Sequence, residues 1–240
     1  LIRLAMAGAP DGQVVAADEQ TGGKGRRGRG FSSPKGSGIY FSYLFRPTDE
    51  LKAHIESTES GLIWASLTSW TAVAASDAIE QACGIRPGIK WVNDLYMNGR
   101  KISGILTQMN TSAESRDIET IVIGIGINVR ERYDDFDEEI REKAGSIYTE
   151  TGIEIKRAGL CALLVQAFDR MTADWPDERE LYRKRYIDDS ILIGRDIVVQ
   201  SPKEQKEAKA AGIDEDFGLI IENADGGMEH IISGDVSVRF

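Results

Sequence analysis

The run at residues 20–31, QTGGKGRRGRGF, limits the fold of this chain more than any other segment. Five glycines are interleaved with four cationic side chains over nine of its positions, and a strand-like stretch at residues 13–18 leads into it. Glycine lets backbone N–H groups approach a ligand closely, and arginine presents a planar fork of donors that fits phosphate or carboxylate oxygens. We interpret the run as a loop that closes over an anion.

Two other interpretations of this run remain open, a flexible arm that binds nucleic acid without sequence preference and a plain solvated loop. It is neither a Walker loop nor the GxGxxG turn of a dinucleotide-binding unit, because SSPKG follows at residues 32–36 in place of a helix. The net charge of the chain is −10, whereas a nucleic-acid-binding domain is expected to be basic. The cationic run is therefore a local exception in an acidic chain, which favours a small anionic ligand.

The length of 240 residues suits one large domain with a small appendage. No apolar run reaches the roughly 18 residues of a membrane span, and no signal peptide is visible. We therefore expect a cytoplasmic protein without a membrane partner. Cys83 and Cys161 lie in helix-like patterns, outside any CxxC or Cys/His cluster, and we expect both to be buried, reduced thiols.

Hydrophobic periodicity and turn residues divide the chain into a larger domain, 1–187, and a smaller one, 188–240. In the larger domain the patterns predict helices at 1–9, 61–83, 156–175 and 177–186, strands at 13–18, 38–45, 94–97, 101–109 and 121–128, and a solvated loop at 131–143. In the smaller domain they predict short strands at 195–200, 217–222, 228–232 and 235–239. Short strands in this arrangement are typical of a small β-barrel. Residues 203–210 have a helix-like composition, and we assign them no state.

A second informative segment spans residues 90–106, KWVNDLYMNGRKISGIL. Asn98-Gly99 is the strongest short signal for a β-hairpin with a type I′ turn. Lys101 opens the return strand, and Gly104 leaves bare backbone against which a ligand can lie.

Alternate glycines also mark the strand at residues 121–128, IVIGIGIN. Gly124 and Gly126 strip side chains from one face of this strand. The bare face can accommodate either a tightly packed helix or a flat ligand, and the pattern does not choose between them. Asn128 follows at the strand end, where its amide can read the edge of a base.

In their order and spacing these segments resemble the biotin–protein ligases (biotin–acetyl-CoA-carboxylase ligases). The resemblance rests on Glu19-Gln20-Thr21, the glycine/arginine run, KWVND at 90–94, KISGIL at 101–106, GIGIN at 124–128 and the small C-terminal domain. It implies an α+β fold, in which a mixed β-sheet backed by helices, of the class II synthetase-like type, precedes a Src-homology-three-like barrel. No helix-turn-helix precedes the ligase segments, so the chain resembles the monofunctional branch, without a DNA partner.

The resemblance implies ATP-dependent formation of biotinyl-5′-AMP, followed by transfer of biotin to a lysine of a biotin carboxyl carrier protein, the carrier subunit of acetyl-CoA carboxylase. Lys101 and Arg26 would be the catalytic residues, Asp94 would bind Mg²⁺, and a homodimer is expected. The biotin site would comprise Gln20, Lys24, Gly25, Arg26, Lys101 and Gly104. The ATP and adenylate site would comprise Arg26, Arg27, Arg29, Phe31, Asn93, Asn128 and Lys101.

The sequence departs from the family pattern in a few places. Lys24 stands where arginine is frequent, Val92 where proline is usual and Phe31 where tryptophan is common. The family pattern also opens with a Ser-Thr-Asn segment of the biotin pocket, and Leu1 follows the position of that segment. Three alternatives stay open: a lipoate–protein ligase, a ligase-like biotin sensor without transfer activity, and a noncatalytic RNA-binding module.

Overall fold

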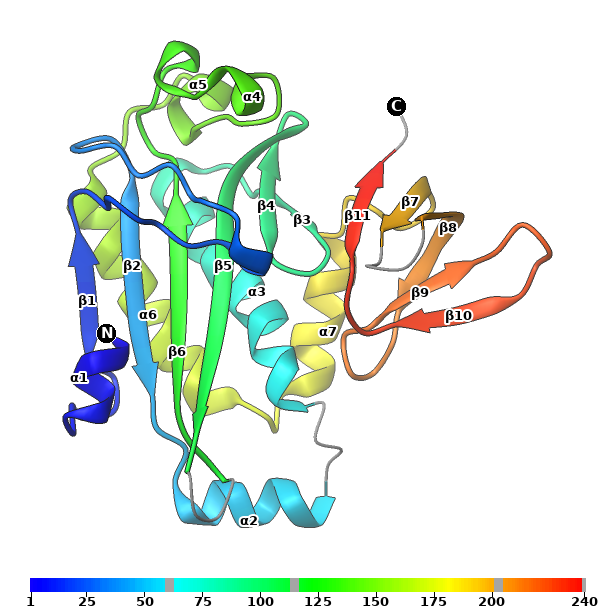
Figure 1. Cartoon of the computed structure of the whole chain (residues 1–240), viewed down its shortest axis with the longest axis horizontal. Coiled ribbons are helices and arrows are strands. Elements are labelled where there is room, and N and C mark those ends of the chain that lie inside the picture. Colours follow the sequence, from blue (N-terminus) through cyan, green and yellow to red (C-terminus); the bar gives the residue numbers. More distant parts are fainter. Residues whose placement is uncertain (59–62, 113–116, 201–204, 239–240) are drawn as a thin grey trace.

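The main body of the computed structural model is a six-stranded sheet in the order β1-β2-β6-β5-β4-β3, shown in Figure 1. The structure describes residues 1–58, 63–112, 117–200 and 205–238. The strands are β1 Val14–Ala17, β2 Ile39–Phe45, β3 Gly88–Lys90, β4 Asp94–Met97, β5 Arg100–Thr111 and β6 Ile118–Ile127. Each pairing between these strands is antiparallel, so the sheet is antiparallel where the family resemblance implied a mixed one.

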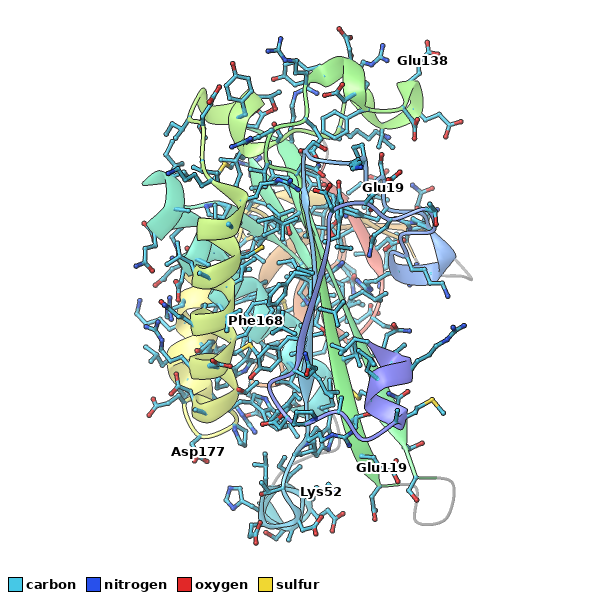
Figure 2. The ribbon with its side chains drawn as sticks, turned by 90° about the vertical axis from the view of Figure 1, so that its left-hand side faces the viewer. Glu19, Lys52, Glu119, Glu138, Phe168 and Asp177 are labelled. Carbon is cyan, nitrogen blue, oxygen red and sulfur yellow. The ribbon has the colours of Figure 1, made fainter. Side chains whose placement is uncertain are left out.

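The long helices α3 and α6 cover one face of this sheet. The helices are α1 Ile2–Met6, α2 Asp49–Thr58, α3 Ile63–Cys83, α4 Glu138–Arg141, α5 Ile147–Thr151, α6 Arg157–Asp174 and α7 Arg179–Asp188, with short 3-10 turns at Arg26–Gly28 and Tyr133–Asp135. In Figure 2, α6 and its Phe168 lie on one side of the sheet, and α1 and the glycine/arginine loop lie on the other. The Phe168 ring meets Phe41 of β2 edge-on at 5.6 Å between centroids. The helix predicted at 156–175 is therefore confirmed as α6, and its Phe168 faces the sheet.

The hairpin between β4 and β5 turns at Asn98 and Gly99, whose φ angles are 47° and 80°. Positive φ at both central residues is what a type I′ turn requires, so the predicted turn is confirmed. No sequence pattern predicted α2, α5 or β3. The prediction of a solvated loop at 131–143 is wrong in part, because this region contains α4 and buries Glu131 and Phe136. The predicted helix start at Gly61 and strand end at Arg239 lie outside the described residues.

The C-terminal part forms a separate five-stranded antiparallel sheet in the order β10-β9-β8-β7-β11. Its strands are β7 Asp196–Gln200, β8 Gln205–Ile213, β9 Leu219–Glu222, β10 Met228–Ile231 and β11 Asp235–Val238. The predicted α+β class and small C-terminal β domain are confirmed, whereas the boundary at 187/188 stays a prediction. The described part of the helix-like segment, 205–210, is strand, because β7 and β9 pair with it on both sides.

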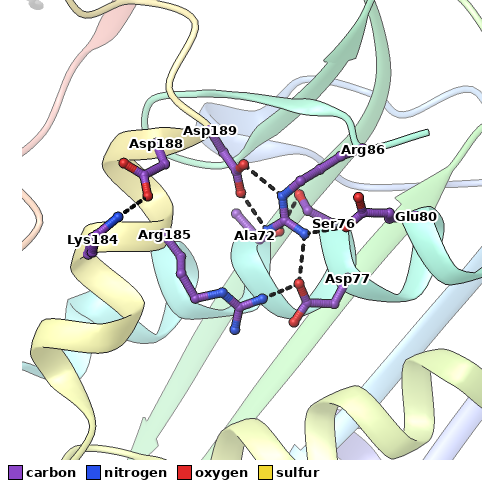
Figure 3. A network of polar contacts seen from close by, with 9 residues as sticks. All are labelled: Ala72, Ser76, Asp77, Glu80, Arg86, Lys184, Arg185, Asp188 and Asp189. Carbon is purple, nitrogen blue, oxygen red and sulfur yellow. Dashed lines mark hydrogen bonds and ion pairs between the residues drawn. The ribbon is translucent and has the colours of Figure 1, made fainter. Parts of the chain in front are cut away.

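A charged network fastens α3, α7 and the chain entering β3, as Figure 3 shows. Arg86 donates from Nε and Nη2 to the two carboxylate oxygens of Asp189, at 2.7 and 2.6 Å. Its Nη1 donates to Asp77 and Glu80 of α3, each at 2.8 Å. Arg185 of α7 also binds Asp77. The Arg86 guanidinium is therefore the group on which three carboxylates converge.

We expect Arg86→Ala to lower the free energy of unfolding by roughly 2–3 kcal/mol, because hydrogen bonds to charged groups are lost and carboxylates are left facing one another. Urea unfolding followed by circular dichroism measures the change. The matched control is Lys184→Ala, which removes the exposed pair with Asp188 drawn in Figure 3 and should cost no more than about 0.5 kcal/mol. An equal loss of unfolding free energy in the two variants would contradict the stabilising role assigned to the Arg86 network.

Glu131 is a buried acid in the loop after β6, with 1% of its surface exposed. Its Oε2 accepts a 3.1 Å hydrogen bond from the Arg130 N–H, whereas Oε1 has no hydrogen-bond partner within the described residues. Burial raises the pKa of this carboxyl above its usual range. Burial also raises the pKa of the neighbouring Tyr40 to about 12, with the charge of Glu131 as a further cause.

A raised pKa in the folded state means that the protonated acid stabilises the fold. This contribution is fully present below the unfolded-state pKa of about 4.3 and is lost as the pH rises through the folded-state value. We expect Glu131→Gln to raise the free energy of unfolding at pH 7.5 by about 1–3 kcal/mol, with a smaller gain at pH 4. Urea titrations at the two pH values test this, with Glu138→Gln on exposed α4 as the control. A larger gain in the free energy of unfolding at pH 4 than at pH 7.5 would contradict the predicted direction of the pH dependence.

Neither cysteine forms a disulfide. Cys83 is buried and Cys161 is half-buried, so the expectation of burial is confirmed for the first and only partly met by the second. Burial raises the pKa of both thiols. Among the helices that the structure describes, none combines the length and the apolar character needed to cross a membrane.

Candidate active site

A pocket of about 310 Å³ brings the two informative sequence segments together on the sheet face opposite α3 and α6. Ten of the predicted site residues line it: Gln20, Lys24, Gly25, Arg26, Arg29, Phe31, Asn93, Asp94, Lys101 and Gly104. In Figure 1 the loop that carries the first of them crosses in front of β6 and β5. The predicted convergence of cationic side chains from two distant parts of the chain is therefore present.

The glycine/arginine loop is held as a narrow antiparallel hairpin. Lys24 forms a bridge with Gly30, and the Gly25 N–H donates to the Arg29 carbonyl at 2.7 Å. The chain reverses through Arg27 and Gly28, whose φ angles are 55° and 74°. Because the backbone turns there in the left-handed region, glycine at the second of these positions relieves the strain. The hairpin presents its cationic side chains at one end of the pocket.

Arg26 and Asn93 join the loop to the sheet. The Arg26 guanidinium donates from Nη1 to Asn93 Oδ1 at 2.9 Å, and Asn93 Nδ2 donates to the Ile105 carbonyl of β5 at 2.9 Å. Both ends of the Asn93 amide are therefore engaged in fixing Arg26 relative to the sheet. We expect this contact to set where the Arg26 charge lies.

Lys101 and Asp94 form an ion pair at the adjoining part of the pocket. Lys101 Nζ lies 2.7 Å from Asp94 Oδ1. Gly104 stands opposite Asp94 in the β4–β5 register. A Cβ at Gly104 would lie 3.3 Å from both Cε and Nζ of Lys101. The bare backbone at Gly104 therefore makes room for the lysine side chain as well as for a ligand.

The glycines of β6 face this pocket. Ile123, Ile125 and Ile127, which alternate with them, belong to the core packed against the helices. A Cβ at Gly126 would lie only 2.4 Å from Cε1 of Phe31, so the bare strand accommodates a flat aromatic ring. Of the two interpretations left open by the sequence, the geometry favours space for a flat group over close packing of a helix.

Asp235 of β11 brings the C-terminal sheet to the same pocket. Its Oδ2 accepts a 3.1 Å hydrogen bond from Arg27 Nη1 and also binds Arg29 Nη2. No local pattern in the sequence could have indicated this contact, because more than 200 residues separate the partners. The other residues that sequence reasoning missed line the sheet side, among them Ser42, Leu106, Gln108 and Val122.

Two predicted site residues do not line the pocket. The Arg27 side chain turns to Asp235. Asn128 is buried, and its Nδ2 donates to the Gly145 carbonyl at 2.9 Å, so part of its amide fixes the chain that leads to α5. Their assignment to the ATP and adenylate site stays a prediction.

The charges of the pocket suit a small ligand with several anionic oxygens. Lys24, Arg26 and Lys101 line the pocket together with Arg29, against the two carboxylates of Asp94 and Asp235. Each carboxylate is already paired with a cation. Over residues 1–58, 63–112, 117–200 and 205–238 there is no cluster of three or more side chains of the types that usually bind metals.

Comparison with known proteins identifies related chains. Residues 3–128 match the model of the biotin/lipoate A/B protein ligase family, and residues 192–239 match that of the biotin protein ligase C-terminal domain. The chain is 35% identical to the bifunctional ligase/repressor BirA of Bacillus spizizenii, over 98% of this chain and 69% of that protein. It is 29% identical to the biotin–[acetyl-CoA-carboxylase] ligase of Paracoccus denitrificans, over 86% and 82%.

Among solved structures, the biotin protein ligase of Aquifex aeolicus in complex with biotin and ATP superposes with a TM-score of 0.80. The sequence identity is 27%, and the match covers 99% of this chain and 93% of that one.

Proposed function

Since the chain belongs to the biotin/lipoate A/B protein ligase family, we propose that it is a biotin–protein ligase that activates biotin with ATP and transfers it to a lysine of a carrier protein. The observation that carries this proposal is the convergence of Arg26 and Lys101 on one pocket. The similarity to an Aquifex ligase solved with biotin and ATP supports the choice of substrates.

In the first step a carboxylate oxygen of biotin attacks the α-phosphorus of ATP, the bond from that phosphorus to the bridging oxygen breaks, and pyrophosphate leaves. Both reactants are anionic. Two like unit charges about 4 Å apart repel by about 4 kcal/mol at an effective dielectric constant near 20. Arg26 and Lys101 supply positive charge where these oxygens must meet, and Lys24 and Arg29 add to it.

In the second step the amine of the acceptor lysine attacks the biotinyl carbonyl, the carbon–oxygen bond to phosphate breaks, and AMP leaves as the amine loses its proton. The acyl phosphate is prone to hydrolysis until then. A loop that covers the pocket excludes water from it. We propose that the hairpin at residues 20–33 has this role, with Gln20 and Gly104 toward biotin and Phe31 toward the adenylate.

Asp94 fits the Mg²⁺ that the family resemblance implies. Magnesium in nucleotide sites is bound by one or two carboxylates together with substrate phosphates and water, and Asp94 supplies such a carboxylate beside Lys101. The ion would supply further charge neutralisation on the phosphate oxygens. The acetyl-CoA-carboxylase carrier as acceptor, a homodimer and a cytoplasmic location stay predictions.

The decisive experiment is incubation of the chain with ATP, Mg²⁺, biotin and a biotin carboxyl carrier domain, followed by intact mass. We expect the mass of one biotinyl group on the carrier, and none when its target lysine is replaced by arginine. Lipoate in place of biotin tests the alternative ligase activity of the same family. Modification with lipoate and not with biotin would overturn the proposal.

A further inference from the structure

A second pocket, of about 740 Å³, lies between the β3–β4 hairpin, the α4–α5 region, the chain that leads into β7 and strand β11 of the C-terminal sheet. Two strands, β4 and β11, contribute residues to both pockets. Along β4, Asp94 lines the first pocket and Tyr96 the second. Along β11, Asp235 lines the first and Ser237 the second. Residues two apart on a strand point to the same face and lie about 7 Å apart, so the two pockets are neighbours along one cleft.

The second pocket has an excess of unpaired positive charge. Lys143 and Arg195 are exposed, and their side chains have no ion pair within the described residues. Lys90 likewise lacks an ion pair there, and its Nζ lies 3.5 Å from the Tyr96 hydroxyl. Arg86, also in the lining, is fully engaged by the network of Figure 3.

The carboxylates of the lining do not cancel this charge. Glu142 is already paired with Arg100 at 3.8 Å. Glu150 is the other acid of the lining, and it has no cationic partner in the described chain. It accepts hydrogen bonds from Tyr133 and Thr149. One unpaired acid thus faces three unpaired cations, Lys90, Lys143 and Arg195. The surplus is notable in a chain of net charge −10.

Lys90 lines the second pocket and interacts electrostatically with charged residues of the first. It stands opposite Asp94 in the β3–β4 register, on the face that also carries Tyr96. Burial lowers the pKa of its ammonium, and the charges acting on it include Asp94, Lys101, Asp235 and Arg29, all of which line the first pocket. An anionic group placed in the second pocket beside Lys90 is therefore held directly next to the Asp94–Lys101 pair.

We propose that the second pocket is the docking site for acidic side chains of the acceptor protein that flank its target lysine. The inference rests on the proposed function, because it is the second substrate of that reaction that needs a surface adjoining the adenylate site. Carboxylates bound by Lys143 and Arg195 at the rim, and by Lys90 at the inner end, direct the acceptor amine toward the first pocket. Rim charges of this kind mainly determine association and its dependence on salt.

The test measures the two half-reactions of the full chain separately. For Lys143→Glu/Arg195→Glu we expect the KM for a carrier domain to rise by at least about tenfold, with the effect fading at high salt. Biotin-dependent pyrophosphate exchange, which needs no acceptor, should stay within about twofold and also reports that the variant is folded. Arg170→Glu, a single charge reversal on α6 across the sheet, is the control and should alter neither.

Each other outcome is decisive. An unchanged carrier KM would overturn the docking site. A raised KM for ATP in pyrophosphate exchange would also overturn it, because the pocket would then bind the triphosphate. If the double variant misfolds, Lys143→Gln/Arg195→Gln is used, with an expected rise of about threefold. Absence of pyrophosphate exchange in the unaltered chain would instead reject the proposed function, so the two failures are distinguishable.

Discussion

Lys101→Ala is expected to abolish biotin-dependent pyrophosphate exchange while the fold survives. The side chain brings a compact charge to the pocket where carboxylate and α-phosphate oxygens must meet. Loss of one transition-state donor in a preorganised site typically costs about 10²–10³ in rate. The loss here should reach at least that range, because the Asp94 carboxylate is left without its cation and repels both substrates.

The measurement is exchange of labelled pyrophosphate into ATP, with the unfolding midpoint determined on the same preparation. Lys209→Ala, on an exposed position of β8, is the matched control and should keep full exchange. In Lys101→Ala/Asp94→Ala, partial recovery would assign part of the loss to repulsion by the stranded carboxylate, and a further loss would assign Asp94 to binding of Mg²⁺. Exchange close to that of the unaltered chain in Lys101→Ala would remove this residue from the catalytic assignment.

Arg26→Ala is expected to release the activated acyl group from the pocket. The guanidinium is held by Asn93 at 2.9 Å, and its other donors remain available for adenylate oxygens. Hydrogen bonds to a charged group contribute about 1.5–3 kcal/mol, which corresponds to a roughly 10–100-fold faster loss of the intermediate. Free biotinyl-AMP should then accumulate, and lysines of bystander proteins should become modified.

A single-turnover reaction without acceptor gives the lifetime of the intermediate. Asn93→Ala should shorten it less, because the cation remains but its position is no longer fixed. The Arg26→Ala/Asn93→Ala double variant should then show little additional loss, since the two residues act as one unit. A normal lifetime in Arg26→Ala would show that the loop does not retain the adenylate.

The parts of the fold that the sequence predicted are those governed by local chemistry. Helix α6 could be predicted because its apolar residues, among them Leu160, Leu164 and Phe168, recur with helical periodicity, which is a property of one segment. Asn98-Gly99 likewise fixed its own turn. Strand β8 was not predicted, because alanine and lysine are good helix formers, and the hydrogen bonds of β7 and β9 override that intrinsic preference.

The residues of the candidate site likewise fall into those that local patterns indicate and those that only the tertiary structure brings in. The loop cations and Lys101 were visible as motifs, and the structure adds their convergence. Ser42 and Gln108 could have been found from strand alternation, since they lie on the faces of β2 and β5 turned away from the core. Asp235 could not have been found, because its partners are fixed only by how the two sheets meet.

The salt bridges from Asp235 to Arg27 and Arg29 join the C-terminal sheet to the glycine/arginine loop of the larger domain. The tip of the hairpin is anchored by a carboxylate that belongs to the last strand of the described chain. Deletion or displacement of that strand would therefore release the hairpin beside the pocket, and Asp235 would be the one pocket-lining residue lost with the strand. We therefore expect that severing the small sheet impairs turnover even if the larger sheet folds alone.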